Sequence, residues 1–149
     1  MESKMKNKYL FIGEDLSGLK IYEIINKYFG KNYRGWMKAW YDINEDFGAW
    51  FPTITETNER PKTEKRWCSN TLSEDKNIII EIDHDFRIVE TPKYDKTRLV
   101  FGRIDGQFQF LGVFTRTITK KDSVLIRKHT KIADGVNLDS FELYKKIEI

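Results

Sequence analysis

The sequence predicts an α+β domain with a strongly curved, antiparallel, barrel-like sheet, an N-terminal helix and a short C-terminal helix. Three observations carry this prediction. A segment near the N-terminus has apolar residues at helical spacing, the C-terminal half alternates apolar and polar residues around an Asp-Gly pair, and the 149 residues fit one domain of ordinary size. Residues 1–149 are therefore expected to form a single domain.

The N-terminal part begins with an expected strand at residues 9–13. Ser17 is placed to cap a helix that runs through residue 29, and Gly30 stands where helices commonly end. The apolar residues of this helix are Leu19, Ile21, Tyr22, Ile24, Ile25, Tyr28 and Phe29. Their spacing predicts one face that packs against the rest of the domain.

An aromatic segment follows, with nine aromatic side chains in residues 28–51. Residues 36–43 and 48–54 read as two strands around a turn at residues 44–47. Residues 55–76 are polar and rich in turn formers, so we expect a long surface loop there. Residues 78–83 then read as a buried strand.

The C-terminal half predicts a meander. Residues 98–104 and 107–118 flank Asp105-Gly106, which is a strong hairpin signal between alternating apolar runs. A period of two places Phe108, Phe110 and Phe114 on one face, which should point to the core. A turn at residues 119–122 leads to a third strand at 123–130, and a short helix is expected from residue 139 or 140.

A resemblance to a known family lies in this C-terminal half. Residues 99–114 and 131–133 read LVFGRIDGQFQFLGVF and KIA, and they resemble the small-barrel strands of PUA-like modules of the SRA and EVE type. That superfamily includes modified-base readers fused to bacterial restriction nucleases. The resemblance implies a pocket in a curved sheet that receives an extruded base, and a setting in bacterial or phage defence.

Aromatic and polar residues provide candidates for such a pocket. Aromatic rings can sandwich an extruded base, and carboxylate or amide groups can bond its edge. The candidate ligand-binding residues are Trp36, Trp40, Tyr41, Asp42, Asn44, Trp50 and Trp67. Ordinary core packing is the alternative interpretation of each tryptophan.

Positive charge is concentrated in one part of the chain. The net charge is +3, yet residues 87–131 alone carry eleven basic and four acidic side chains. Such a segment can present a basic sheet face to phosphates, and the candidate phosphate-binding residues are Arg98, Arg103, Arg116, Arg127 and Lys128. Solvated strand edges that discourage aggregation are the alternative.

Catalytic signals are weaker than binding signals. Glu81, Asp83 and Asp85 alternate along one strand and can ligate a hard divalent ion, although no lysine stands at a spacing typical of nucleases. The two histidines are far apart, and the chain has no GxGxxG motif and no Walker loop. We therefore expect no catalytic residue, no resident metal and no cofactor, and favour a binding protein over an enzyme.

The function predicted from these patterns is a binding module for nucleic acid or a nucleotide-like ligand, including a modified base held in an aromatic pocket beside a basic sheet face. The pattern fits DNA and RNA equally. One alternative is a small phage or bacterial protein that binds a partner protein or sequesters a nucleotide signal, and another is a metal-dependent nuclease. No apolar run is long enough to span a membrane, and a single cysteine suits a reducing compartment, so a cytoplasmic location is expected.

Overall fold

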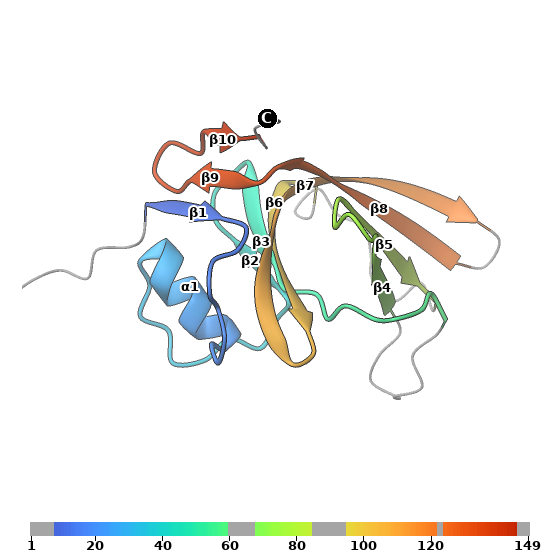
Figure 1. Cartoon of the computed structure of the whole chain (residues 1–149), viewed down its shortest axis with the longest axis horizontal. Coiled ribbons are helices and arrows are strands. Elements are labelled where there is room, and N and C mark those ends of the chain that lie inside the picture. Colours follow the sequence, from blue (N-terminus) through green and yellow to red (C-terminus); the bar gives the residue numbers. More distant parts are fainter. Residues whose placement is uncertain (1–7, 60–67, 85–94, 122–123, 146–149) are drawn as a thin grey trace, which may run out of the picture.

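The computed structural model describes residues 8–59, 68–84, 95–121 and 124–145, and within them it contains one helix and ten strands (Figure 1). The elements are β1 Tyr9–Phe11, α1 Ile21–Phe29, β2 Trp40–Asp42, β3 Phe47–Trp50, β4 Cys68–Leu72, β5 Ile78–Asp83, β6 Thr97–Ile104, β7 Gln107–Lys121, β8 Val124–Ala133, β9 Gly135–Asn137 and β10 Leu143–Tyr144. The predicted mixture of helix and sheet is present, with far more strand than helix. No helix in the described ranges is long and apolar enough to cross a membrane.

The strands form two sheets. A small sheet has the order β1-β9-β10, and a large sheet has the order β2-β3-β6-β7-β8-β5-β4. Strands β3 and β6 pair in parallel, while the other pairs of the large sheet are antiparallel, so the sheet is mixed rather than purely antiparallel as predicted. The described strands do not close into a barrel.

Helix α1 begins later than the sequence predicts. The amide of Ser17 donates to the Asp15 carboxylate at 3.0 Å, which makes a local turn instead of a helix cap. The first helical turn is closed by Glu23, whose Oε1 accepts a hydrogen bond from the Lys20 amide at 3.0 Å. The helix ends at Gly30 in the left-handed conformation, as predicted.

Strand β6 is buried on both sides of the large sheet. Leu99 and Phe101 pack in one apolar cluster with α1, on what we call the helix face. Val100 points the other way, into a second cluster with Trp40 and Trp50, on what we call the pocket face. The two faces have different chemistry, which positions the site described below.

The predicted period of two in β7 is broken at Gly112. Phe110 packs on the helix face, but Phe114 packs on the pocket face, so the prediction that both share a face is wrong. The register of β6 against β7 shifts at this point, and Gly112 has φ 121°. A Cβ at Gly112 would lie 2.8 Å from the Ala133 carbonyl oxygen, so the irregularity depends on glycine.

Two further predictions were wrong. Residues 68–72 form β4 and pair with β5, so the expected loop at residues 55–76 is interrupted by a strand. Within the described residues the expected C-terminal helix does not form, because the side chain of Asn137 accepts hydrogen bonds from the amides of Asp139 and Ser140, and the chain then pairs Leu143 with Val136. The hairpin at Asp105-Gly106 is confirmed.

Candidate functional site

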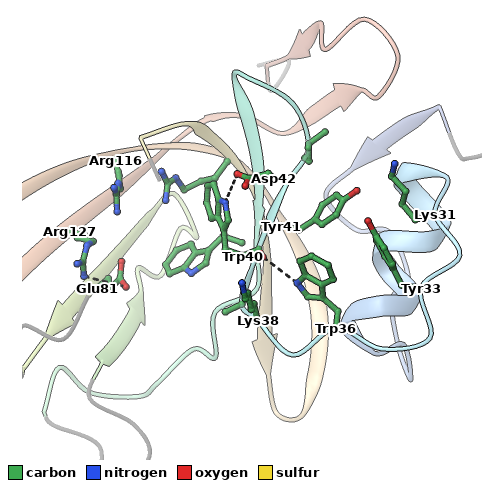
Figure 2. Close-up of a pocket in the computed structure, with 14 residues that line it drawn as sticks. Lys31, Tyr33, Trp36, Lys38, Trp40, Tyr41, Asp42, Glu81, Arg116 and Arg127 are labelled. Atoms are coloured by element: carbon green, nitrogen blue, oxygen red, sulfur yellow. Dashed lines mark hydrogen bonds and ion pairs between the residues drawn. The ribbon is translucent and has the colours of Figure 1, made fainter. Parts of the chain in front are cut away.

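A pocket of about 780 Å³ lies where the loop before β2 and the β2–β3 hairpin meet the pocket face of the large sheet (Figure 2). Its lining consists of Lys31, Tyr33, Trp36, Lys38, Ala39, Trp40, Tyr41, Asp42, Ile43, Trp50, Glu81, Arg98, Arg116 and Arg127. Figure 2 shows two parts of this pocket on opposite sides of β2. One part is aromatic and the other is charged.

The aromatic part contains Tyr33, Trp36 and Tyr41. The Trp36 ring stands edge-on to Tyr41 with centroids 5.2 Å apart, and Tyr33 lies 5.3 Å from Trp36. The indole of Trp36 donates a hydrogen bond to the Trp40 carbonyl oxygen at 3.2 Å. Burial, together with the neighbouring Tyr33 hydroxyl, raises the pKa of Tyr41 above its ordinary value, so Tyr41 keeps its proton.

Successive side chains of β2 point to opposite faces of the sheet. Trp40 and Asp42 therefore lie on the charged side of the pocket, and Tyr41 lies on the aromatic side. The Trp40 indole donates to Asp42 Oδ1 at 2.8 Å, and the Lys96 ammonium lies 3.2 Å from the same oxygen. The Arg98 guanidinium covers the Trp40 ring at 4.9 Å. These contacts hold the Asp42 carboxylate in a fixed position at the pocket.

Gly48 makes this arrangement of Trp40 possible. In the β2–β3 pairing, Gly48 lies opposite Asp42. The ring of Trp40 lies against the backbone of Gly48. A Cβ at Gly48 would collide with the six-membered ring of Trp40. The absence of a side chain at residue 48 therefore lets the indole reach Asp42.

The charged part is built from β5 and β8. Glu81 Oε1 lies 3.0 Å from His129 Nε2, and Arg127 lies 3.6 Å from Glu81 and 3.8 Å from Asp83. His129 stacks on Trp50, with ring centroids 4.2 Å apart, although β6 and β7 separate their strands in the sheet. Ring stacking thus connects the buried charges to an aromatic wall of the pocket.

The protonation states of this group follow from burial and charge. Burial lowers the pKa of His129, and the charges of Arg98 and Arg116 lower it further, so the imidazole is neutral near pH 7. Burial alone would raise the pKa of Glu81, but the hydrogen bond from His129 and the charge of Arg127 outweigh it and lower that pKa. The neutral imidazole therefore donates through Nε2, and its Nδ1, which has no hydrogen-bond partner within the described residues, carries a lone pair.

Comparison with known proteins identifies the family. The model of the SRA family, the SET and RING associated domain, matches residues 3–138. The chain belongs to the SRA family. The predicted resemblance to a PUA-like modified-base reader is thereby confirmed.

A solved structure agrees with this assignment at the level of the fold. The SRA domain described here is similar to one chain of "The 5-Hydroxymethylcytosine-Specific Restriction Enzyme AbaSI", with a TM-score of 0.63 and 15% sequence identity. The match covers 94% of this chain but only 44% of that one. No curated protein matches the sequence.

The structure brings most of the predicted ligand-binding residues of this SRA domain to one pocket. Trp36, Trp40, Tyr41, Asp42 and Trp50 all line it. Asn44 does not, because its side chain accepts hydrogen bonds from the amides of residues 46 and 47 and holds the β2–β3 turn. Trp67 lies outside the described residues.

The predicted phosphate-binding residues separate into two groups. Arg98, Arg116 and Arg127 line the pocket, and the first and last of these are almost completely buried. Arg103 packs over the Phe108 ring beside the β6–β7 turn, and Lys128 is exposed between the buried residues 127 and 129, on the other side of β8. The basic segment therefore does not form one continuous face.

Sequence reasoning missed several residues of the site. Tyr33 and Lys38 line the pocket and belong to the aromatic segment, so its composition could have indicated them. Glu81 and His129 had been considered only as metal ligands, His129 being set aside because the two histidines are far apart. Their contact joins β5 and β8, and no local pattern predicts a pairing between residues 48 positions apart.

Proposed function

We propose that this SRA domain binds double-stranded DNA that carries a modified cytosine, and that it holds the modified base, turned out of the helix, in the pocket described above. SRA domains bind nucleic acid, so the partner class follows from the family. One observation supports the finer proposal: the pocket combines aromatic walls, a fixed carboxylate and a buried charged end.

Each part of the pocket has a role in this proposal. The rings of Trp40 and Trp50 provide flat apolar walls for a base. The Asp42 carboxylate, fixed by Trp40 and Lys96, accepts a hydrogen bond from the exocyclic amino group of cytosine. Glu81 and Arg127 lie beyond the base, where they recognise a polar substituent such as the hydroxymethyl group for which the similar restriction enzyme is specific.

The charge of the pocket is consistent with a nucleic-acid ligand. Five basic residues line it, Lys31, Lys38, Arg98, Arg116 and Arg127, against the two acidic residues Asp42 and Glu81. A positively charged cleft attracts the phosphate backbone and makes binding dependent on salt. A reader of this kind would serve bacterial or phage defence by marking modified DNA for a nuclease.

The metal-dependent nuclease is less well supported. Glu81 and Asp83 both face the Arg127 guanidinium, which takes the position that a cation would need. Within the described ranges, no three residues among His, Cys, Asp and Glu gather as metal ligands, and Asp85 lies outside them.

The test is a titration with short duplexes that differ only at one cytosine, unmodified, methylated or hydroxymethylated, followed by tryptophan fluorescence at two salt concentrations. We expect tighter binding to a modified duplex, and binding that weakens steeply with salt. Asp42→Asn should lower the affinity for the modified duplex by roughly tenfold to a hundredfold, which corresponds to the loss of one hydrogen bond to a charged group.

The matched control is Asp105→Asn, which removes a carboxylate in an exposed turn that asparagine tolerates well. This variant should bind like the unchanged protein. Equal affinity for all three duplexes, or equal effects of the two substitutions, would contradict the proposal. Tighter binding to modified RNA than to DNA would redirect it.

A further inference from the structure

Three arginines from three different strands meet at the charged part of the pocket. Arg98 lies on β6, Arg116 on β7 and Arg127 on β8, and all three line the pocket. Arg98 and Arg127 are only 2% and 1% exposed, and Arg116 is half-buried. Arginine side chains are rarely buried so completely unless negative groups compensate their charge, so the acids around this cluster decide what ligand it suits.

The carboxylates that line the pocket are already engaged with the protein. Both oxygens of Glu81 face partners, since Oε1 lies 3.0 Å from His129 Nε2 and Oε2 lies 3.6 Å from Arg127. Asp42 Oδ1 lies 3.2 Å from the Lys96 ammonium. Among the described residues of the lining, these two carboxylates stand against five cations. This excess of positive charge favours a ligand that brings a negative group into the pocket.

The positive charge gathers around the contact between Glu81 and His129. Arg127 lies opposite Glu81 in the register of β5 and β8, and Arg116 lies opposite His129 in the register of β7 and β8. Residues directly opposite in antiparallel strands share a face, and Figure 2 shows Arg116 and Arg127 on the same side of the pocket as Glu81. Burial is the main cause of the lowered pKa of His129, and the charges of Arg98 and Arg116 lower it further. The arginines therefore converge where the proposed function places the substituent of the bound base.

We propose that the charged part of the pocket selects a cytosine whose C5 substituent is itself an anion, a carboxylate, over cytosines with neutral substituents of similar size. The inference rests on the function proposed above and names the kind of substituent that the pocket prefers. A carboxylate accepts two parallel hydrogen bonds from one guanidinium, which a hydroxymethyl or formyl group cannot do. Arg116 is the arginine best placed to meet it, because Arg98 and Arg127 are almost completely enclosed by the protein.

The experiment measures the affinity of the unchanged protein for duplexes of one sequence that carry unmodified, hydroxymethylated, formylated or carboxylated cytosine at one position. Formyl and carboxyl groups are both planar and similar in size, but only the carboxyl group is charged at neutral pH. The phosphates are the same in every duplex. We expect the carboxylated duplex to bind roughly tenfold to a hundredfold more tightly than the formylated one. Equal affinity for these two duplexes would overturn the inference.

Substitution of Arg116 tests which residue meets the carboxylate. Arg116→Gln should reduce the ratio of the two affinities to within about threefold, and should leave the affinity for the hydroxymethylated duplex within about threefold of that of the unchanged protein. Arg116→Lys keeps the charge but not the paired hydrogen bonds, so its ratio should be intermediate. The matched control is Arg103→Gln, because Arg103 packs over Phe108 beside the β6–β7 turn, away from the pocket lining. It should keep the full ratio.

The other anion that a duplex offers to these arginines is a backbone phosphate. If a phosphate occupied them, Arg116→Gln would weaken all four duplexes equally and leave the ratio unchanged, which would overturn the inference. An equal fall of the ratio in Arg103→Gln would assign it to overall charge, with the same consequence. Tighter binding of the hydroxymethylated than of the unmodified duplex, without preference for the carboxylate, would overturn this inference and leave the proposed function standing. If no modified duplex binds more tightly than the unmodified one, the proposed function itself fails.

Discussion

The two faces of β6 show how one strand supports two different environments. The helix face joins a cluster of fifteen buried residues that contains only apolar and tyrosine side chains. The pocket face has six buried apolar residues, and beside them lie the buried side chains of Arg98, Glu81, Asp83, Arg127 and His129. The helix face is mainly an apolar core, although Tyr41 of its cluster also lines the pocket, and the pocket face holds the buried charges.

The energetic difference between the faces follows from this composition. Burial of apolar surface stabilises the helix face directly. Burial of charges costs free energy that pairing recovers only in part, so the ionic group on the pocket face is a weak source of stability. Its arrangement around Trp50 makes better sense as a means of fixing the pocket wall.

The sharpest test of the comparison uses adjacent residues of β6. Phe101→Ala should lower the free energy of unfolding by about 3–5 kcal/mol, because a fully buried ring is removed from the larger cluster. Val100→Ala should cost less, about 1–3 kcal/mol, because fewer atoms are removed. Denaturant unfolding measures both values.

Binding should show the opposite order in this pair. Val100 packs with Trp40 and Trp50, so its truncation should reduce the preference for modified DNA more than Phe101→Ala does, measured where both variants remain folded. If Phe101→Ala impaired this preference more strongly, the proposed division between the faces would be wrong.

The next effect concerns the buried ionic group. Glu81→Gln keeps the size of the side chain but removes the charge that faces Arg127 and accepts from His129. We expect a loss of about 2–3 kcal/mol in unfolding free energy, together with weaker binding of a hydroxymethylated duplex. Chemical denaturation and the fluorescence titration provide the two measurements.

Glu74→Gln is the matched control, since Glu74 is exposed in the turn between β4 and β5. The free energy of unfolding of the Glu74→Gln variant should differ from that of the unchanged protein by less than about 0.5 kcal/mol. A similar small change in Glu81→Gln would show that Glu81 contributes no net stabilisation, and that the ionic group does not hold the pocket face together.

The elements that the sequence predicted correctly are those whose signals are local. The Asp105-Gly106 hairpin, the buried strand at β5 and the glycine end of α1 each depend on a few adjacent residues. The predictions that failed needed information from elsewhere in the chain. Strand β4 forms because β5 pairs with it, and the break in β7 depends on the close approach of residue 133 to Gly112.

The candidate site shows the same limit. Trp36, Trp40, Trp50 and Asp42 were named from the composition of the aromatic segment, which is local. The contact between Glu81 and His129 and the stacking of Trp50 on His129 each join distant strands. Only the order of strands in the sheet brings these residues together, so residue spacing could not reveal them.

The smallest expected effect is a pH dependence that belongs to the pocket face. The pKa of His129 is lowered by burial in the folded protein from an ordinary value of 6.5, so below that pH the unfolded chain binds a proton that the folded chain does not. Stability should therefore fall on acidification below about pH 6.5, by at most about 1.4 kcal/mol per pH unit, and should not depend on this group above it. The lowered pKa of Glu81 acts in the same direction at more acidic pH.

Urea unfolding between pH 7.5 and 5.5 measures this slope, with His129→Gln as the comparison. The variant lacks the titrating ring but retains His84, which is half-buried and bonded to Ser69, so any remaining slope reports the other groups. The difference in slope between the two proteins isolates His129. Identical slopes would mean that His129 takes up its proton equally in the folded and unfolded chains, and the neutral imidazole between Glu81 and Trp50 would then be the wrong description of the pocket face.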